Sequence, residues 1–389
     1  TMKVARFSHF TALVIAGASA AVAFLPSVSR ANESQAAVLA LLFRPGAREL
    51  ALGGAGVAGA RGSAASYYNP ALLSWQAIAE GQRYPRAVGT TYYKILQNFG
   101  LNDMYYMYFP TMFSVKDWGQ FSVNVTYLNL GEQQRTSEGG ENLGTFNTYT
   151  LAVGLSYASK IGVHTSAGIT AKWFYDHLAD AGTGFEKGDP TGTGFAVDAG
   201  IAYRPSDRLY FGAALRNYGP NVQYIDAKQA SPTPVNFTVG TSWKAFDTQY
   251  NDVTIMADLY KPLVQDYRKS WYLSILRSWA DESVYKVEEI PDGQGGVTRV
   301  EHRNTLREET RQVDVLTGVE YTYADYVAIR GGYFRDWDGQ RNWMTFGGGL
   351  RLPIASTALL VDFAYVHSLN GKGSDPNDGQ QVYSIGFTF

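Results

Sequence analysis

The sequence of 389 residues contains no cysteine. This absence excludes disulfide frameworks, thiolate zinc sites and thiol catalysis. Long apolar runs are also scarce, because no stretch after residue 31 approaches the ~18 residues of a membrane-spanning helix. Basic residues number 33 and acidic residues 35, so no excess of positive charge is available for nucleic acid. We therefore expect no nucleic-acid partner.

Residues 1–31 have the pattern of a signal peptide. Lys3 and Arg6 give a positive start, and an apolar stretch follows from Phe10 to Leu25. Small residues at Ser29 and Ala31 suit a cleavage site. The alternative is a retained membrane anchor, but an apolar run of 16 residues is short for that role. We expect export and cleavage, which leave 30 basic against 35 acidic residues and a net charge of −5.

Aromatic residues are abundant. The chain has 27 Tyr, 20 Phe and 8 Trp, together with 41 Gly. Its mean hydropathy is nevertheless only −0.19. This combination fits the aromatic girdles of a membrane β-barrel better than a helical membrane protein.

From Tyr84 onward, apolar and polar residues alternate with period two between turns. In Phe121–Tyr127, for example, Phe, Val, Val and Tyr share one face, whereas Ser, Asn and Thr share the other. We count about fourteen such segments: 84–97, 103–115, 121–127, 149–157, 164–175, 195–203, 211–215, 235–243, 253–259, 313–323, 327–333, 346–352, 359–365 and 383–389. Most approach the ~10 residues that a tilted strand needs to cross a bilayer.

Period-two alternation alone would also suit a soluble β-sandwich or a propeller, and the charges separate these alternatives. The following charged residues lie on the face opposite the large apolar side chains: Asp198, Arg216, Lys244, Asp258, Asp314, Glu320, Arg330, Arg351 and Asp362. A sandwich would bury the apolar face, whereas a membrane barrel turns it to lipid and keeps paired charges in a wet lumen. We therefore predict an all-β fold, a transmembrane antiparallel β-barrel of about 14 strands over residues 84–389.

Residues 32–83, between the leader and the barrel, are rich in Gly and Ala and lack strand alternation. Asn69 suits a helix N-cap or an Asx-turn, with Pro70 at the first helical position. A barrel of about fourteen strands approaches the sizes that leave an open channel. We therefore predict that residues 32–83 fold into the lumen as a hatch.

Residues 266–312 interrupt the alternation. Trp271–Trp279 carries apolar residues at a helix-compatible spacing, and Asp281–Arg311 mixes acids and bases around an Asp292-Gly293 turn. This excursion is either a solvated loop or a docking surface for a partner. We expect a further outer loop over Asp176–Thr193.

Three patterns with possible chemistry are weak. The G-x-G-x-x-G at 54–59 matches a dinucleotide fingerprint, but no βαβ alternation surrounds it. Residues 375–379 resemble a fragment of a calcium loop without its remaining ligands, so a turn is the simpler interpretation. His367, Ser368 and Asp362 would be the candidates for a hydrolase. The histidines have no metal-binding spacing, and we expect no catalytic residues, no metal and no cofactor.

The order of several short motifs resembles the PorV/PorQ family, which is related to the FadL-type outer-membrane transporters. The hatch motif that carries the resemblance consists of Arg48, Gly53, Gly54, Gly56, Tyr68, Asn69 and Pro70. It is followed by the turn at 217–220, the strand at 257–262 and a Gly-rich stretch from 318 to 350. The resemblance implies a barrel with a lumenal hatch in the bacterial outer membrane. Phe389 ends a clean alternating strand, which resembles the assembly signal of such barrels.

The resemblance also implies two different functions. Likeness to PorV implies a non-enzymatic component of type IX protein secretion, which binds the C-terminal signal domains of secreted cargo. Its partners would be outer-membrane lipid, the cargo, a translocon barrel and a surface attachment complex. Likeness to FadL implies instead a channel for hydrophobic small molecules, with such a ligand in the lumen. A barrel that serves only as an anchor is a third alternative, and composition does not choose among them.

Overall fold

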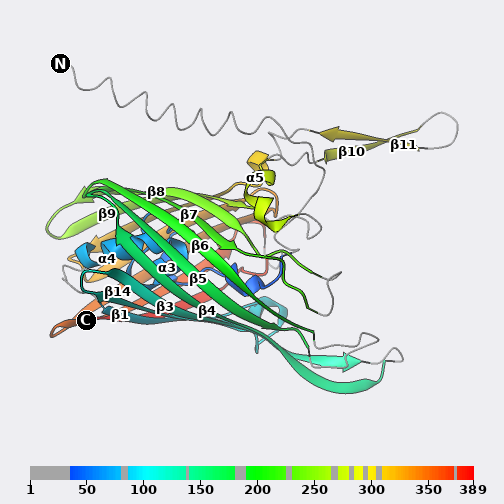
Figure 1. Cartoon of the computed structure of the whole chain (residues 1–389), viewed down its shortest axis with the longest axis horizontal. Coiled ribbons are helices and arrows are strands. Elements are labelled where there is room, and N and C mark those ends of the chain that lie inside the picture. The colour runs from blue at the N-terminus through cyan, green and yellow to red at the C-terminus, as the bar shows by residue number, and fades with distance from the viewer. Residues whose placement is uncertain are drawn as a thin grey trace, which may run out of the picture.

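The computed structural model describes residues 36–79, 86–136, 140–179, 190–224, 230–263, 270–279, 284–291, 297–303, 309–371 and 375–389. Within these ranges, fourteen antiparallel strands close into a barrel in the order β1-β16-β15-β14-β13-β12-β9-β8-β7-β6-β5-β4-β3-β2 (Figure 1). The predicted barrel of about fourteen strands is therefore confirmed. The predicted signal peptide, residues 1–31, lies outside the described residues.

Most barrel strands contain the segments predicted from the alternation and extend beyond them. The strands are β1 (Arg86–Lys94), β2 (Tyr105–Val115), β3 (Gly119–Thr136), β4 (Asn142–Lys160), β5 (Thr165–His177), β6 (Thr191–Ser206), β7 (Leu209–Tyr218), β8 (Asn236–Asp247), β9 (Asn251–Pro262), β12 (Asp314–Tyr323), β13 (Val327–Asp336), β14 (Arg341–Ile354), β15 (Thr357–Ser368) and β16 (Gln381–Thr388). Short turns join them at one end and long connections at the other. The short-turn end is the periplasmic end in barrels of this kind.

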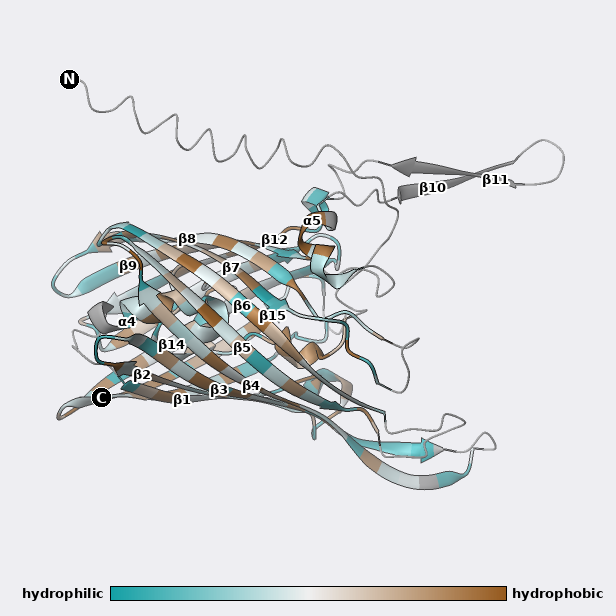
Figure 2. Cartoon of the chain, viewed as in Figure 1, coloured by the Kyte–Doolittle hydropathy of each residue, from teal (hydrophilic) through white to brown (hydrophobic). Residues whose placement is uncertain are grey.

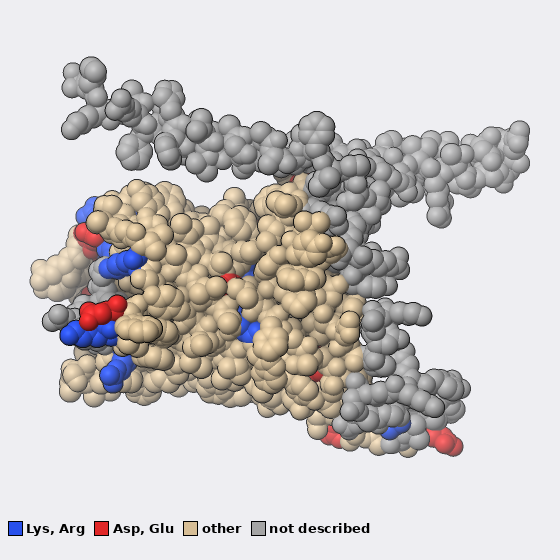
Figure 3. All heavy atoms as spheres, viewed as in Figure 1, with Lys and Arg blue, Asp and Glu red and all other residues tan. Residues whose placement is uncertain are grey.

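The outer surface of the barrel is apolar between two rows of aromatic rings. Near the short turns, the ring of Phe121 lies 5.8 Å from that of Phe113 and 5.1 Å from that of Tyr157. Nearer the long loops, Tyr149 lies 6.0 Å from Tyr127. Eight residues of tilted β4 separate Tyr149 from Tyr157, a rise of roughly 20 Å, which is close to the ~25 Å apolar band of such barrels. Figure 2 shows the apolar positions along the strands, and Figure 3 shows that this face is nearly free of charge between its ends.

The wall differs in height around the barrel. β3 and β4 contain 18 and 19 residues, whereas β1 and β16 contain 9 and 8. β3 pairs with β2 up to Asn129, and β4 pairs with β5 from Tyr149 onward. Beyond these positions β3 and β4 continue as a two-stranded extension past the long-loop end of the barrel (Figure 1).

The segment that precedes β1 lies inside the lumen, as predicted. Its short helices are η2 (Leu39–Leu41), α2 (Ala47–Ala51), η3 (Gly62–Ala64), α3 (Ala65–Tyr68), η4 (Pro70–Leu72) and α4 (Leu73–Ala79). We call residues 36–79 the hatch. Ala47, Ala51, Leu52 and Leu73 are completely buried, because the hatch packs against the inner face of the wall. No described helix is long and apolar enough to cross a membrane.

The excursion between β9 and β12 contains more regular structure than predicted. Its described parts include η7 (Trp271–Leu273) and α5 (Ser274–Arg277), within the stretch where the spacing suggested a helix. They also include β10 (Val284–Pro291) and β11 (Val297–Arg303), which form a separate antiparallel pair. The two alternatives for this excursion, a solvated loop or a docking surface, both remain predictions. The Asp292-Gly293 turn of the excursion lies outside the described residues, as does most of the loop predicted over 176–193.

Candidate functional site: the hatch and its contacts with the wall

A chain of buried ion pairs joins the hatch to the wall. Arg48, on α2, donates from Nε and Nη2 to the two carboxylate oxygens of Glu320 on β12, at 2.9 and 2.8 Å. Glu320 also accepts from Nε of Arg330 at 2.6 Å, and Arg330 continues to Asp362 at 2.5 Å. Glu320 is 1% exposed. Because a buried charge without its partner is costly, this chain fixes the position of α2 against β12, β13 and β15.

Two further charged residues of the hatch complete this cluster. Glu49 is buried and accepts from Nη1 of Arg48 at 3.0 Å. Arg61 lies at the edge of the cluster, 3.5 Å from Glu320, with its side chain 44% exposed. Neither was singled out from the sequence. Apolar and polar residues do not alternate in the hatch as they do in the strands. The sequence therefore gives no pattern that shows which charges of the hatch face the wall.

A second attachment uses Asp258 of β9, which accepts the backbone N–H groups of Gly56 and Val57 at 2.6 and 2.8 Å. The carboxylate therefore satisfies two adjacent donors of a Gly-rich turn that would otherwise be buried without partners. Gly56 could not be replaced easily, because a Cβ there would lie 2.6 Å from the ring of Tyr68. The G-x-G-x-x-G pattern thus shapes a turn packed against the wall.

Asn69 and Pro70 connect the hatch to β6, three strands away from β9 in the wall. The side-chain oxygen of Asn69 accepts from the N–H of Ala71 at 3.0 Å, and Pro70 begins η4. The predicted N-cap is therefore confirmed. The Asn69 amide nitrogen donates to the carbonyl of Val57 at 2.9 Å and to that of Ile201 on β6 at 3.0 Å. One side chain thus caps a helix, braces the hatch and binds a strand.

Glycines of the wall allow the hatch backbone to approach closely. At Gly332 on β13, a Cβ would lie 2.0 Å from the backbone nitrogen of Gly53. At Gly212 on β7, a Cβ would lie 2.1 Å from the carbonyl oxygen of Val57. These clashes would involve backbone atoms rather than movable side chains. The hatch backbone can therefore approach the wall this closely only where the wall residue is glycine.

The remaining residues of the hatch motif form turns and contacts within the hatch. Gly53 and Gly54 have φ of 72° and 83°, the left-handed region that favours glycine, directly after α2. Tyr68 is buried and donates from its hydroxyl to the carbonyl of Pro45 at 2.7 Å. These residues therefore shape the hatch itself.

A separate polar cluster lies on the wall at β5, β6 and β7. Asp198 is buried, lies 2.7 Å from the ammonium of Lys172 and accepts the N–H of Asn217 at 2.8 Å. Arg216 donates to Asn236 at 2.9 Å, and its guanidinium lies 4.9 Å from the ring centre of Tyr67 in the hatch. Lys172 was missed, although it alternates with Trp173 and so occupies the inner face.

Of the nine charges predicted on the inner face, Asp314 is buried at the start of β12, and the other eight occupy four distinct places. Glu320, Arg330 and Asp362 form the ionic chain, Asp258 binds the hatch backbone, and Asp198 and Arg216 belong to the polar cluster. Lys244 lies at the short-turn end, 3.6 Å from Asp247 and Asp252, with its side chain 28% exposed. Arg351 lines a cavity at the same end.

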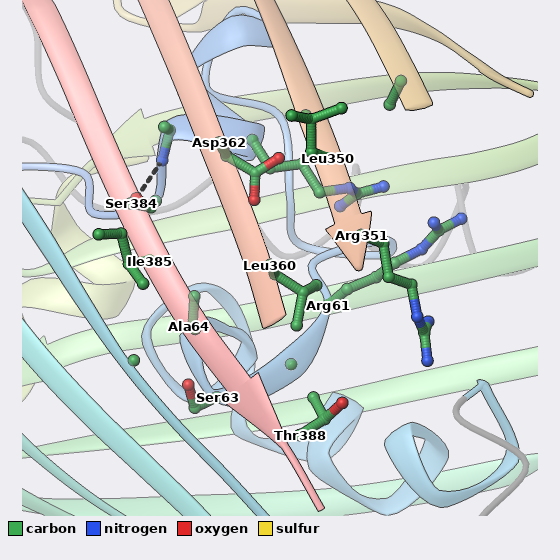
Figure 4. Close-up of a pocket in the computed structure, with 18 of the residues that line it drawn as sticks. Arg61, Ser63, Ala64, Leu350, Arg351, Leu360, Asp362, Ser384, Ile385 and Thr388 are labelled. Carbon is green, nitrogen blue, oxygen red and sulfur yellow. Dashed lines mark hydrogen bonds between the residues drawn. The ribbon is translucent and has the colours of Figure 1, made fainter. Parts of the chain in front are cut away.

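This cavity, of about 160 Å³, lies between the hatch and the wall. Figure 4 shows Ser63 and Ala64 of the hatch close to Leu360, Ile385 and Thr388 of the strands, all of which line the cavity. Its lining also includes charged residues: Arg48, Glu49, Arg61, Glu320, Asp325, Arg330, Arg351 and Asp362. The cavity is therefore bordered by both apolar and charged residues, and it adjoins the ionic chain.

The weak chemical patterns take part in ordinary contacts. Asp375 accepts from the indole nitrogen of Trp343, and Asp378 accepts the N–H of Ser368 at 2.8 Å, so residues 375–379 form a turn that is bound to the wall. Asp362 pairs with Arg330, whereas His367 is half exposed. Within the described residues, no three His, Asp or Glu side chains gather closely enough to hold a metal ion.

Phe389 lies where the barrel closes. Its N–H donates to the carbonyl of Arg86 at 2.9 Å, and its carbonyl accepts the N–H of Arg86 at the same distance. Its side chain is 47% exposed on the outer surface. The last residue of the chain thus pairs with the first residue of β1.

Comparisons with known structures show the fold. The toluene transporter TbuX of Ralstonia pickettii is 16% identical, has a TM-score of 0.51 and aligns over 88% of this chain and 97% of its own. The monoaromatic hydrocarbon channel CymD is 12% identical, has a TM-score of 0.50 and aligns over 88% and 97%. A FadL homologue of Pseudomonas aeruginosa is 11% identical, has a TM-score of 0.45 and aligns over 89% and 98%. At these identities the likeness concerns the fold alone.

A comparison with protein families is more specific. No curated protein sequence matches the chain. The model of the family described as "Type IX secretion system protein PorV" matches residues 28–268, which include the hatch and β1 to β9. This match covers more than half of the sequence, and it supports the outer membrane as the location of the barrel. The chain belongs to the PorV family of type IX secretion system proteins.

Proposed function

We propose that this protein is a carrier in the outer membrane that binds the C-terminal signal domain of secreted proteins and passes them to a surface attachment complex. Membership of the PorV family is the observation that carries the proposal. In this role the barrel would also dock on the translocon barrel of the secretion machinery. Binding and transfer require no bond to be made or broken by the carrier itself.

The filled lumen supports a carrier rather than a conduit for proteins. The hatch is attached through Arg48 to β12, through the backbone N–H groups that bind Asp258 to β9, and through Asn69 to β6. A protein chain could pass through the lumen only if all three attachments broke. A carrier with this structure would instead hold its cargo on surfaces outside the lumen.

The test is deletion of the gene, combined with isolation of the tagged full-length protein from native membranes. We expect isolation to recover proteins that share a C-terminal β-sandwich signal domain. We expect deletion to leave those proteins in the periplasm, and the intact gene to restore their transfer. Normal surface attachment of all such proteins in the deletion strain would overturn the proposal.

The second candidate function is a channel for hydrophobic small molecules, favoured by the fold shared with TbuX and CymD. A cavity of about 160 Å³ is large enough for one aromatic ring, because apolar cavities near 150 Å³ bind benzene. The eight charged residues that border the cavity argue against this function, since hydrophobic ligands favour mostly apolar pockets with few polar groups. If the protein is such a channel, deletion of its gene should abolish uptake of a monoaromatic hydrocarbon and leave protein secretion unchanged.

A further inference from the structure

Residues 270–279, which include η7 and α5, lie on the outside of the barrel. We call them the outer segment. The ring of Trp271 lies 5.1 Å from that of Tyr218 on β7, and the ring of Trp279 lies 6.4 Å from that of Phe237 on β8. The hydroxyl of Tyr218 also donates to the carbonyl of Tyr272 at 3.1 Å. Figure 1 shows α5 beside the barrel at its long-loop end.

The strand register shows that these contacts are on the lipid-facing side. Tyr218 pairs with Val197 and Leu215 with Ala199, so β7 has one residue more than β6 between these pairs. This bulge, with Asn217 at φ 60°, turns Tyr218 outward like Val197, which is 39% exposed. Phe237 pairs with Lys261, which shares the outward face of β9 with Leu259.

The contacts also lie at the depth of the apolar belt. Phe195 is nearer to the long loops on β6 than Val197, and it is still apolar, outward-facing and 65% exposed. The level of Tyr218, which pairs with Val197, therefore lies within the belt. The outer segment rests against a surface that other strands present to hydrocarbon.

Lys261 explains how the outer segment is held in place. It is on the outward face of β9 but only 2% exposed. Its ammonium lies 2.7 Å from Glu309, donates to Gln312 at 2.8 Å and is 5.1 Å from the ring centre of Trp279. Without this cover, a cation would face lipid, which is unfavourable. Burial raises the pKa of the Glu309 carboxyl, and the nearby ammonium of Lys261 opposes that rise.

The outer segment has two different faces. Ser274 and Ser278, four residues apart, are 4% and 3% exposed and form the buried side. Tyr272 and Leu276, also four residues apart, are 58% and 68% exposed and form the free side. This spacing places each pair on one side of a helical turn. The free side is therefore apolar and continuous with the lipid-facing belt.

We propose that the outer segment is a membrane anchor, whose Tyr272 and Leu276 insert at the hydrocarbon–headgroup boundary of the leaflet that faces the cell exterior. Lipid is the occupant that the structure favours, because the free side continues the apolar belt at the same depth. Tyrosine and tryptophan also suit this boundary, since they combine an apolar ring with a polar group. The anchor holds the base of the excursion against the wall, independently of the cargo carrier function.

The absence of cysteine makes a direct test possible. Single Tyr272→Cys and Leu276→Cys variants of the full chain are spin-labelled in phospholipid vesicles. Collision rates with oxygen, which concentrates in lipid, and with a water-soluble nickel chelate are then measured. Phe195→Cys on the belt is the lipid control, and Gln133→Cys on the extension of β3 is the water control. Heat-modifiable migration in gels confirms that each variant is folded.

We expect the labels at 272 and 276 to give an oxygen-to-nickel collision ratio several-fold above that at 133 and close to that at 195. Ratios equal to that at 133 would overturn the proposal and leave the free side as a surface for a protein partner. A Lys261→Ala change should increase the mobility of the label at 276 and leave that at 195 unchanged. Unchanged mobility at 276 would show that Lys261 does not hold the segment.

Discussion

The hatch and the outer segment are both attached to the same wall, from its two sides, and they differ in how many contacts attach them. The hatch is bound through the ionic chain at Glu320, through Asp258 and through Asn69, over much of the barrel circumference. The outer segment depends on the aromatic contacts of Trp271 and Trp279, on the hydrogen bond from Tyr218 to Tyr272 and on the contact of Lys261 with the ring of Trp279. The difference indicates a permanently filled lumen and an excursion that can be detached while the barrel stays closed.

The largest effect is expected from Glu320→Ala. Removing this carboxylate takes away the acceptor shared by the buried guanidinium groups of Arg48 and Arg330, which keep only Glu49 and Asp362, respectively. Such a loss costs about 3–5 kcal/mol, which we expect to appear in the free energy of unfolding and as protease cleavage within the hatch. Asp338→Ala, in the exposed turn between β13 and β14, is the control. An unfolding free energy equal to that of the control would contradict a role for the ionic chain.

A smaller loss is expected from Gly332→Val, because a Cβ at this position meets the backbone of Gly53. Overpacking of this kind costs about 1–3 kcal/mol. The neighbouring Gly331→Val is a closely matched control, since the nearest atom to its Cβ is 4.0 Å away. Thermal unfolding in detergent should separate the two variants. Equal melting temperatures would show that the hatch does not need the close approach.

Asp258→Ala should destabilise the hatch turn by about 1–3 kcal/mol, because the N–H groups of Gly56 and Val57 lose their acceptor. Hydrogen exchange followed by mass spectrometry should show faster exchange in the peptide that contains these residues. Asp258→Asn keeps one carbonyl acceptor, so its effect should be smaller. Protection that is identical in all three proteins would rule out this attachment.

The smallest effect on the barrel is expected from Lys261→Ala. We expect protease cleavage in the excursion to increase, because Glu309 loses its buried partner and the excursion is released, while the unfolding free energy of the closed barrel stays close to that of the unaltered protein. Lys116→Ala, in an exposed short turn, serves as the control. Increased protease cleavage within the hatch of the Lys261 variant would show that the attachments of the hatch and of the outer segment are coupled. That result would contradict the independence of the two regions.

The barrel could be predicted because the sequence features that specify it lie within single strands and turns. Alternation of side chains along each strand specifies the lipid face, and turn residues mark the strand ends. The composition of residues 32–83 was enough to predict the hatch, because a Gly- and Ala-rich segment cannot bury a core of its own and must pack against a larger structure. Both predictions depend on neighbours in sequence.

The contacts within the lumen could not be predicted in the same way. Arg48 and Glu320 are 272 residues apart, and no pattern in the sequence pairs them. The bulge at Asn217 breaks the alternation, so the outward position of Tyr218 follows only from the register. The strands β10 and β11 lie in a charged tract whose composition favours a loop. The positions of Lys244 and Arg351 near the short turns likewise depend on strand tilt and closure.

The unequal height of the wall has a consequence for the long-loop end of the protein. Eight residues of β16, tilted by about 40°, rise roughly 20 Å, which equals the height of the apolar belt measured along β4. The additional residues of β3 and β4 therefore stand beyond the belt, and they form a raised rim on one flank only. A large molecule that approaches the long-loop end meets this rim beside β3 and β4 and a low edge beside β1 and β16, so the wall favours one direction of approach.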